Sequence, residues 1–497
     1  MDLALLLDMA VRDAPDRHAI TDADGTTLTR GELMTAARRA ATRFSALGAS
    51  RIGYLATNGR ALPVSLFGAA QAGVPFVPIN YRLSDEQLAD VIAREPSMAL
   101  VATPDARGRA PLSQVETVVA PADLLAGTTA AGDDSSFELV DPDSIAVRLY
   151  TSGTTAEPKA AVLRHRHLTS YVIATTEFGG AEPDEAALIS VPPYHIAGVT
   201  SIISNLYCGR RIVYLDTFDP VRWCDVARRE RITHAMVVPT MLARILECAG
   251  DEGVPTLRSL AYGGAKMPTP VIERALERLP DVDFTNAYGL TETSSTITVL
   301  GPDEHRAAMA TDEPRVRARL SSAGKPVPGV EIVLLDERGQ PCEPGVVGDI
   351  LVRGEQVSGE YGESASLAAD RWFPTRDRGW LDEDGYLFVA GRSDDTIIRG
   401  GENIAPAEIE DALERHPAVK ECAVVGVADD EWGQRIAAVV VRHPGHSVSA
   451  DELRAWVRDR LRGSKTPDLI EFCSELPYTD TGKLLRRALR DRFHTAR

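Results

Sequence analysis

The chain has 497 residues, more than one hydrophobic core usually organises, so at least two domains are expected. Its formal net charge of −18 would repel a polynucleotide backbone, which argues against nucleic acid as a partner. No apolar run of about eighteen residues predicts a membrane span, and the first residues show no secretory pattern. The six cysteines are widely separated and form no C-x-x-C pair, so we expect a cytoplasmic protein without disulfides or a zinc site.

The first half of the chain alternates helical and strand patterns. Residues 32–47 predict a helix, because Leu33, Ala36, Ala40 and Phe44 recur at helical spacing. Short apolar runs predict buried strands at residues 52–56, 75–78, 144–149, 211–215, 235–238 and 259–262. This alternation predicts a mixed α/β fold of stacked, mostly parallel sheets.

The pattern changes from Ala323 onward. Apolar runs separated by Gly, Pro and Asp turns predict an antiparallel, β-barrel-like region with strands at residues 330–335, 348–353 and 386–390. A small α+β unit is predicted next, with helices at 406–416 and 450–461 and strands at 423–427 and 435–441. We therefore expect a large N-terminal domain at residues 1–393 and a small mobile C-terminal domain at residues 394–497.

Residues 150–161 carry the strongest local signal for chemistry. They read Tyr-Thr-Ser-Gly-Thr-Thr-Ala-Glu-Pro-Lys-Ala-Ala and directly follow a predicted strand. Small residues let backbone amides approach an anion, hydroxyls donate to phosphate oxygens, and Lys159 adds positive charge. The segment lacks the G-x-x-x-x-G-K-[ST] pattern of a Walker A loop. By itself it is equally typical of a polar strand-to-helix connection.

Four further segments carry charged, hydroxyl or aromatic residues beside glycines. They are Tyr288-Gly-Leu-Thr-Glu-Thr, a predicted turn; Arg376-Asp-Arg-Gly, at a predicted strand end; Gly391-Arg-Ser-Asp-Asp-Thr-Ile-Ile-Arg-Gly-Gly-Glu-Asn; and Thr479-Asp-Thr-Gly-Lys-Leu-Leu-Arg-Arg. With residues 150–161, their order and separation resemble the adenylate-forming superfamily, over about residues 10 to 492. The resemblance is strongest to its acyl- and aryl-CoA ligases, such as 4-chlorobenzoate-CoA ligase and fatty acyl-CoA synthetases.

The resemblance implies a site for ATP. Loop 151–159 would hold the β- and γ-phosphates, Tyr288 would stack on adenine, and Asp377 with Arg392 would hold the ribose hydroxyls. The implied ATP- and AMP-binding residues are Thr151, Ser152, Gly153, Thr154, Thr155, Lys159, Gly263, Gly264, Ala265, Asn286, Tyr288, Asp377 and Arg392.

The resemblance also implies the groups that act on the reacting atoms. Thr291 would contact the α-phosphate, and Glu292 would bind Mg²⁺, a hard cation suited to carboxylate oxygens. Lys483 would bridge the attacking carboxylate and the α-phosphate, stabilising charge as it develops. His195 would gate or orient the acid.

Most of these residues also have an ordinary structural interpretation. Asp377 and Arg392 could form a surface ion pair, Glu292 could be a carboxylate in the first turn of a helix, and His195 and Tyr288 could fill space in the core.

The resemblance implies a second step in which coenzyme A takes the acyl group. The C-terminal domain would rotate about Asp394, bringing Gly400 and Gly401 to line the pantetheine tunnel. Trp432 matches a residue that stacks on the coenzyme A adenine, and Arg82 would meet a coenzyme phosphate. Trp432 is equally typical of a half-buried residue at a strand edge.

The acid pocket would be formed by residues 195–201, 238, 261–265 and 286–296, which are mostly small or apolar. They favour an aryl, cinnamoyl-like or medium acyl acid, bound by a monomer or homodimer. Two alternatives remain from the sequence. One is a stand-alone adenylating enzyme that passes the acyl group to a carrier-protein pantetheine or another nucleophile, and the other is a nucleotide-binding regulator without catalysis.

Three residues depart from the family pattern. Ala156, Ala160 and Arg376 stand where glycine is common, and a side chain restricts positive φ. The basic residues near the C-terminus, including Arg486 and Arg490, could form a solvated helix face or contact nucleotide phosphates.

Overall fold

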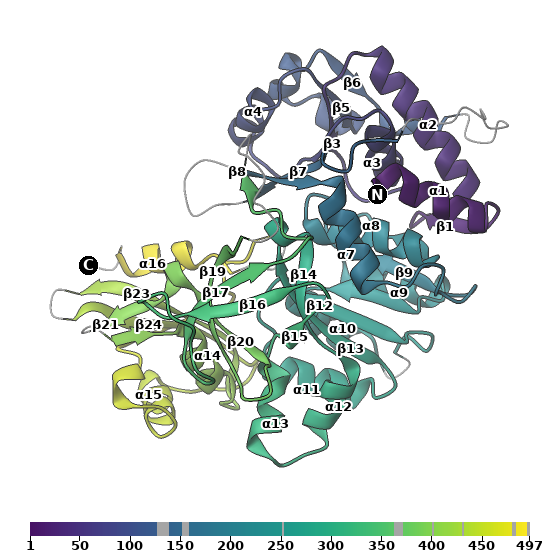
Figure 1. Cartoon of the computed structure of the whole chain (residues 1–497). Helices are drawn as coiled ribbons and strands as arrows, with labels where there is room; N and C mark the ends of the chain where they lie inside the picture. The colour runs from purple at the N-terminus through teal and green to yellow at the C-terminus, as the bar shows by residue number, and fades with distance from the viewer. Residues whose placement is uncertain are drawn as a thin grey trace.

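The computed structural model describes residues 1–126, 139–151, 159–250, 253–361, 371–399, 402–429, 432–479 and 484–494. Two α/β sheets form most of the N-terminal part, an antiparallel sheet follows, and a smaller C-terminal region comes last (Figure 1). The mixed α/β fold with a large and a small domain, predicted from the sequence, is therefore confirmed.

The first sheet has the strand order β18-β8-β7-β4-β3-β5-β6. Its strands are β3 (Arg51–Leu55), β4 (Phe76–Pro78), β5 (Met98–Ala102), β6 (Thr117–Val119), β7 (Ile145–Thr151), β8 (Lys159–Arg164) and β18 (Glu360–Tyr361). Strands β3 to β7 run parallel, and β8 and β18 add an antiparallel edge. Every residue of β5 is buried, as expected in a parallel sheet covered on both faces.

The second sheet has the order β15-β14-β13-β12-β11-β9-β10-β1-β2. Its strands are β1 (His18–Thr21), β2 (Thr27–Thr29), β9 (Ala186–Ile189), β10 (Arg211–Tyr214), β11 (His234–Val237), β12 (Ser259–Gly263), β13 (Asp283–Leu290), β14 (Ser295–Leu300) and β15 (Lys325–Pro326). Its centre, from β10 to β13, is parallel. This sheet positions most of the candidate site.

Helices lie between the two sheets and on their outer faces. The inner layer includes α1 (Leu3–Asp13), α2 (Arg30–Ala46), α3 (Ala61–Gln71), α7 (His165–Thr175) and α8 (Ile196–Cys208), which share one core with both sheets. The outer face of the second sheet packs on α9 (Pro220–Arg229), α10 (Pro239–Cys248), α11 (Thr269–Arg278) and α12 (Pro302–Met309). The remaining helices here are α4 (Asp85–Ala93), α5 (Pro104–Arg107), α6 (Pro121–Leu125) and α13 (Pro314–Ala318).

Local signals explain where these helices begin. At the start of α2, the Thr29 hydroxyl accepts from the Glu32 amide at 3.1 Å, and the Glu32 carboxylate accepts from the Thr29 amide at 2.8 Å. This capping box satisfies two amides that the helix leaves without partners. Helix α2 then packs closely on α3, where a Cβ on Gly68 would lie 2.7 Å from Ala40.

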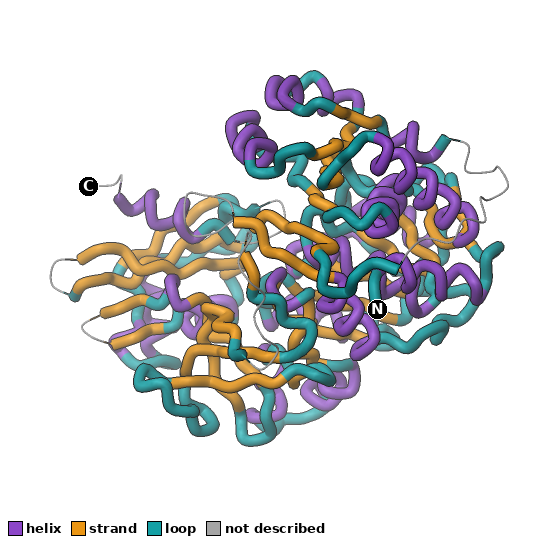
Figure 2. The backbone as a smooth tube through the Cα atoms, turned by 45° about the horizontal axis from the view of Figure 1, so that its top comes forward, coloured by secondary structure: helices purple, strands orange, loops and turns teal. Residues whose placement is uncertain are grey.

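The antiparallel sheet has the order β16-β17-β19-β20 and precedes the C-terminal region. Its strands are β16 (Glu331–Leu335), β17 (Gly348–Arg353), β19 (Phe373–Leu381) and β20 (Leu387–Arg392). The C-terminal region, at the left in Figure 2, contains β21 (Ile397–Arg399), β22 (Glu402–Ile404), α14 (Pro406–Glu414), β23 (Val419–Asp429), β24 (Gly433–Arg442), α15 (Ala450–Arg458), β25 (Leu469–Cys473) and α16 (Arg486–His494). Strands β23, β24 and β25 form a sheet with its own apolar core.

Two local predictions were wrong. Tyr288 does not lie in a turn, because β13 continues through Leu290 and pairs with β14. Asp377 does not lie at a strand end, because β19 runs on to Leu381, pairing with β17 and β20. In both places a neighbouring strand continues the ladder past polar residues that resembled a turn.

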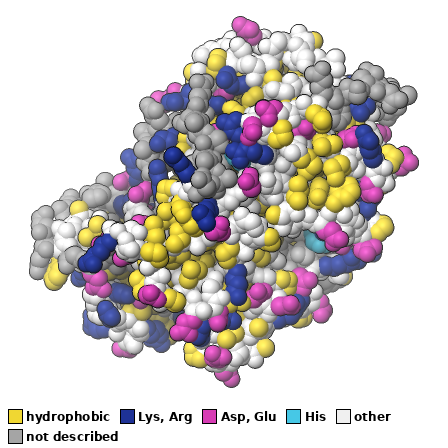
Figure 3. Space-filling view, in the orientation of Figure 1, with side chains coloured by type: hydrophobic (Ala, Val, Ile, Leu, Met, Phe, Trp, Pro, Cys, Tyr) yellow, Lys and Arg dark blue, Asp and Glu magenta, His cyan; other side chains and the backbone are white. Residues whose placement is uncertain are grey.

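The surface carries mixed charge, and none of the described helices is long and apolar enough to cross a membrane. Figure 3 shows acidic and basic side chains interspersed over one face of the molecule. The excess of acidic residues is therefore not gathered into a single acidic face on this side.

Two buried histidines, His165 and His167, are expected to make the folded state less stable at acidic pH. The Nδ1 atoms of His165 and His167 accept hydrogen bonds from the amides of Leu3 and Arg164, each at 3.2 Å. Burial lowers the pKa of His165 to about 4 and of His167 to about 3. The neutral histidines therefore contribute their full stabilisation of the folded state above pH 6.5, where histidine in the unfolded chain is also neutral. This stabilisation is lost as the pH falls toward the folded-state pKa values of about 4 and about 3.

We expect the free energy of unfolding to fall by about 2 kcal/mol per histidine between pH 7 and pH 5. Urea unfolding across this range is the measurement. In His165→Asn the amide oxygen can still accept from Leu3, and only the contribution of His165, about 2 kcal/mol, should disappear from the pH dependence. An unfolding free energy that stays constant from pH 7 to pH 5 would contradict this prediction.

Candidate active site

A buried carboxylate, Asp377, lies at the centre of the candidate site. The register of β19 and β20 places it opposite Arg392, whose Nε lies 2.9 Å from Asp377 Oδ1. The Tyr288 hydroxyl, from β13, donates to Asp377 Oδ2 at 2.6 Å. Asp377 is only 6 % exposed, so this is not the surface ion pair that the sequence left open. Burial and the adjacent carboxylate raise the pKa of Tyr288, which keeps its hydroxyl protonated and able to donate.

Glu292 lies on the short 3-10 helix η2 (Thr291–Thr293), directly after β13. The Tyr361 hydroxyl donates to Glu292 Oε1, and the Glu292 carbonyl accepts from the amides of Ser358 and Gly359 at 2.8 and 3.2 Å. Burial and the Glu292 charge raise the pKa of Tyr361. Glu292 is therefore a held and mostly buried carboxylate, beside Thr291 and four residues beyond Tyr288.

The described residues contain no group of three or more His, Cys, Asp or Glu side chains that could hold a metal ion. A single carboxylate at Glu292 is nevertheless compatible with Mg²⁺, which usually takes one or two protein carboxylates together with substrate phosphates. The donor type and the burial of Glu292 therefore fit the predicted magnesium ligand.

Residues 263–265 lie at the end of β12, where Gly263 pairs with Ala287, the residue before Tyr288. A Cβ on Gly263 would lie 2.3 Å from the Ala287 carbonyl oxygen, and Gly264 has φ +81°. Both positions therefore require glycine, and the main chain carries no side chain where it passes β13. Asn286, on β13, is already engaged, because its Nδ2 donates to the Ser322 carbonyl at 2.9 Å.

The predicted phosphate loop joins two antiparallel strands and is not the strand-to-helix connection that its composition also suggested. Thr151 ends β7 and Lys159 begins β8, directly opposite in the register. Ala160 is buried within β8 opposite Tyr150, so glycine is not needed there. The residues between them, including Ser152, Gly153, Thr154, Thr155 and Ala156, lie outside the described residues.

His195 lies at the N-terminus of α8. Its ring centroid lies 5.0 Å from that of Tyr194, which in turn contacts Tyr81 edge-on at 5.4 Å. The turn is tight, since a Cβ on Gly198 would lie 2.7 Å from the Pro192 carbonyl oxygen. His195 is thus the N-cap residue of α8, the helix that borders the expected acid pocket.

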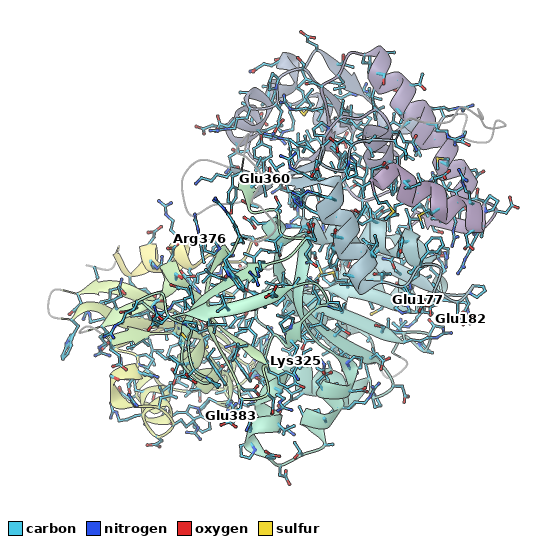
Figure 4. The ribbon with its side chains drawn as sticks, viewed as in Figure 1. Glu177, Glu182, Lys325, Glu360, Arg376 and Glu383 are labelled. Atoms are coloured by element: carbon cyan, nitrogen blue, oxygen red, sulfur yellow. The ribbon has the colours of Figure 1, made fainter. Side chains whose placement is uncertain are left out.

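Arg376 stands where the resemblance implies glycine, and its backbone conformation favours that residue. Its φ is +63°, a left-handed conformation that glycine adopts without strain. The residue precedes Asp377 near the junction of the antiparallel sheet with the first sheet, where Figure 4 also places Glu360.

We expect Arg376→Gly to leave the free energy of unfolding within about 1 kcal/mol of the parent. Relief of left-handed strain should offset the greater entropy of glycine in the unfolded chain. Arg378→Gly, on the same strand without positive φ, is the matched control and should cost about 1 kcal/mol. Urea unfolding measures both. An Arg376→Gly loss larger than that of Arg378→Gly would contradict the interpretation.

The residues assigned to coenzyme A are not brought into contact with the cluster around Asp377 by any described interaction. Trp432 lies in the β23–β24 turn, 46 % exposed, with the Arg399 guanidinium 5.6 Å from its ring centroid. Arg82 follows β4, 5.6 Å from the ring centroid of Tyr81. Gly400, Gly401 and Lys483 lie outside the described residues.

Asp394 separates two sets of contacts. On one side, the Ser393 hydroxyl donates to Asp349 of β17 at 3.3 Å. On the other side, Asp395 pairs with Arg490 of α16 at 2.6 Å. Arg486 pairs with Glu410 at 2.7 Å, so these basic residues bind carboxylates of their own region and are not a merely solvated helix face.

A direct contact also joins the C-terminal region to the N-terminal part. The Lys266 ammonium, two residues beyond Gly264, donates to Asp411 Oδ1 at 2.5 Å and to the Ala407 carbonyl at 3.1 Å. Sequence reasoning missed Lys266, and also Tyr361. Neither belongs to the motifs that pointed to the site.

Comparison with known proteins identifies the family of the chain. Residues 7–362 match the model of the AMP-binding enzyme family, and residues 408–483 match that of the AMP-binding enzyme C-terminal domain. A feruloyl-CoA synthase from Amycolatopsis sp is 36 % identical over 485 residues, 94 % of each chain. The fatty acid–[acyl-carrier-protein] ligase ScoC of Streptomyces coeruleorubidus is 34 % identical, over 95 % of this chain and 92 % of that one.

A solved structure is similar over nearly the whole chain. The O-succinylbenzoate coenzyme A synthetase MenE from Bacillus subtilis, in complex with ATP and magnesium ion, has a TM-score of 0.84 at 29 % identity, covering 98 % of this chain and 99 % of that chain. The family match, the long alignments and this similarity agree with the resemblance seen in the sequence. The chain belongs to the AMP-binding enzyme family of adenylate-forming enzymes.

Proposed function

We propose that this protein is an acid–thiol ligase that activates a carboxylic acid with ATP and transfers the acyl group to coenzyme A. In the first step a carboxylate oxygen attacks the α-phosphorus, the bond to the β-phosphate breaks, and pyrophosphate leaves. In the second step the coenzyme A sulfur attacks the acyl carbon and AMP leaves. The observation that carries the proposal is the buried Asp377 held by Tyr288 and Arg392, with Glu292 close by in sequence.

The nucleotide site follows from this cluster. Asp377 would accept the two ribose hydroxyls, and Arg392 would keep the carboxylate charged and oriented. The Tyr288 ring would stack on the adenine. The hydrogen bond of its hydroxyl to Asp377 holds the ring beside the carboxylate that would bind the ribose. Residues 263–265, whose first two members are glycines without a side chain, would border the base together with Asn286.

The phosphates would lie toward Glu292 and the β7–β8 hairpin. Residues 151–155 with Lys159 would hold the leaving pyrophosphate, and Thr291 would donate to the α-phosphate. Glu292 would hold Mg²⁺, which when bound neutralises charge on the polyphosphate. The Tyr361 hydroxyl orients the Glu292 carboxylate for that contact.

Two residues would act on the acid. Lys483 would place its ammonium between the carboxylate and the α-phosphate, which offsets repulsion between two anions. No general base is needed, because the nucleophile is already ionised. His195, at the top of α8, would orient the carboxylate at the mouth of the pocket.

The second step would use a rotation about Asp394, which divides residues 1–393 from residues 394–497. The contacts on its two sides support this position, since Ser393 is tied to β17 and Asp395 to α16. After rotation, Gly400 and Gly401 would line the thiol path, while Trp432 and Arg82 would contact coenzyme A. The exposure of Trp432 leaves its ring accessible for stacking.

The acid is proposed to be an aryl, cinnamoyl-like or medium acyl acid, in keeping with the feruloyl and fatty acid names of the relatives. The carrier-protein relative also supports a second candidate function, in which a protein-bound pantetheine replaces coenzyme A as acceptor.

Pyrophosphate release tests the proposal directly. The protein is incubated with ATP, Mg²⁺ and a panel of such acids, with and without coenzyme A. Acid-dependent pyrophosphate followed by a coenzyme A thioester supports the ligase, and thioester only with a carrier protein supports the second candidate. If no acid releases pyrophosphate, the ligase proposal fails, and a nucleotide-binding regulator becomes the better account.

A further inference from the structure

A cavity of about 160 Å³ lies between α8 and the second sheet, where the acid pocket was expected. Ser201 and Ala261, both predicted pocket residues, line it together with Ile189 and Met236. This volume is many times larger than the space that one water molecule needs. The cavity is apolar along most of its length, but its far end is polar, and that end was not anticipated from the sequence.

The sheet register gives the depth of this polar end. Gly263, Ala261 and Ser259 alternate on β12 and so share one face, with Met236 opposite Ala261 and His234 opposite Ser259 on β11. At about 3.3 Å per residue, Ser259 lies about 13 Å along the strand from Gly263. The polar end is therefore separated from the adenylate site by a distance that requires a ring or chain in the acid.

Arg210 lines the polar end and pairs there with Glu185 and Asn205. Its Nε donates to Glu185 at 3.0 Å, Nη2 lies 2.9 Å from Glu185, and Nη1 donates to Asn205 Oδ1 at 3.1 Å. The guanidinium charge is thus balanced by Glu185. A second carboxylate on the acid would find the Arg210 cation already paired with a carboxylate.

The hydrogen bonds around Thr233 assign the proton on His234. The Thr233 hydroxyl donates its one hydrogen to the Ala186 carbonyl at 3.0 Å and accepts from the Ala186 amide at 2.9 Å. His234 Nδ1 lies 2.9 Å from the same oxygen and 3.8 Å from Glu185 Oε2, and both of these oxygens can accept a hydrogen bond, so we assign the ring hydrogen to Nδ1. The lone pair then resides on Nε2, which has no hydrogen-bond partner among the described residues.

His234 is neutral at pH 7, because burial and the nearby Arg210 lower its pKa to about 4. Nε2 is consequently a hydrogen-bond acceptor at the end of the cavity. The hydroxyls of Ser201 and Ser259, also in the lining, can donate to or accept from a ligand. A group that both donates and accepts is the best match to these three side chains.

We infer that the acid carries a neutral hydroxyl at the end remote from its carboxylate, and that this hydroxyl donates to His234 Nε2. The inference rests on the proposed function, since it names the acid for the same site. Ser201 or Ser259 would donate to the hydroxyl oxygen in turn. An acid lacking the hydroxyl leaves these partly buried polar groups without that partner, and a methyl ether cannot donate.

Acid-dependent pyrophosphate release with matched acids tests the inference. The aryl arm compares 4-hydroxycinnamate with cinnamate and 4-methoxycinnamate, and the aliphatic arm compares 8-hydroxyoctanoate with octanoate. In the arm that fits the cavity, kcat/KM should be at least about 10-fold higher for the hydroxy acid. Equal values for hydroxy and unsubstituted acids, or for the hydroxy acid and its methyl ether, would overturn it while leaving the ligase proposal intact.

Two variants locate the recognition at His234. His234→Leu removes the acceptor and should lower kcat/KM about 10-fold for the hydroxy acid, with no loss for the unsubstituted acid. Met236→Leu, two residues along the same strand face, is the matched control and should change both acids alike. If His234→Leu keeps the preference for the hydroxy acid, the assignment is overturned. If no acid releases pyrophosphate at all, the proposed function fails and this inference fails with it.

Discussion

Lys483→Ala should lower acid-dependent pyrophosphate release by about 10²–10³-fold, the scale on which loss of one charge-stabilising group slows a reaction. The loss is expected mainly in kcat, since the lysine would act most strongly on charge that develops in the transition state. Transfer from a supplied acyl-adenylate to coenzyme A should be nearly unchanged, because Lys483 would withdraw before that step.

Lys465→Ala is the matched control for this experiment. Lys465 is a cation of the same region and pairs with Glu408 at 2.6 Å on the surface, where such pairs contribute little. It should leave both half-reactions within about 2-fold of the parent. If Lys483→Ala releases pyrophosphate at the rate of Lys465→Ala, the assigned role of Lys483 is wrong.

Glu292→Gln is expected to slow pyrophosphate release to a similar extent, with a higher Mg²⁺ concentration needed for half-maximal rate. A neutral amide is a weaker ligand than a carboxylate for a hard cation, so charge on the leaving pyrophosphate is less well balanced. The amide oxygen can still accept from Tyr361, so the fold around η2 should persist.

Tyr361→Phe separates the carboxylate from its hydrogen bond. This variant keeps the charge at Glu292 and removes only the donor, so a loss below about 10-fold is expected. Titration of each variant with Mg²⁺ at saturating ATP and acid gives the comparison. Equal losses and unchanged Mg²⁺ dependence in both variants would show that Glu292 acts only through its contact with Tyr361.

The helices and strands were largely predictable because hydrophobic spacing and turn residues are local signals. The helix predicted at residues 32–47 corresponds to α2, and the strand at residues 348–353 corresponds to β17. The errors at Tyr288 and Asp377 share a cause. Strand pairing with a distant segment decided the conformation there, against the local composition.

The contacts of the candidate site were less predictable than its residues. Tyr288 and Asp377 were both proposed for nucleotide binding, but their mutual hydrogen bond joins residues 89 apart in the chain. Tyr361, which holds Glu292 across 69 residues, belongs to no motif. Such pairs depend on the register and packing of separate sheets, which a single sequence does not specify.

The proposed acid pocket was also only partly predictable from the sequence. Ser201 and Ala261 were anticipated, whereas His234 and Met236 were not. The alternation along β11 separates two faces, but the sequence does not say which face meets α8. His234, to which we assign hydroxyl recognition, could therefore be identified only from the packing of α8 on β11.

Asp394, between Ser393 and Asp395, is a suitable junction for chimeras in which the C-terminal segment is exchanged between relatives. The pairs that Asp395 and Glu410 make with Arg490 and Arg486 lie wholly within residues 395–494, while the residues that line the proposed acid cavity all precede residue 262. A graft joined at Asp394 would therefore keep these ion pairs in the incoming segment and acid choice in the recipient. Of the contacts described, Lys266 with Asp411 and Ala407 would have to be rebuilt across the graft.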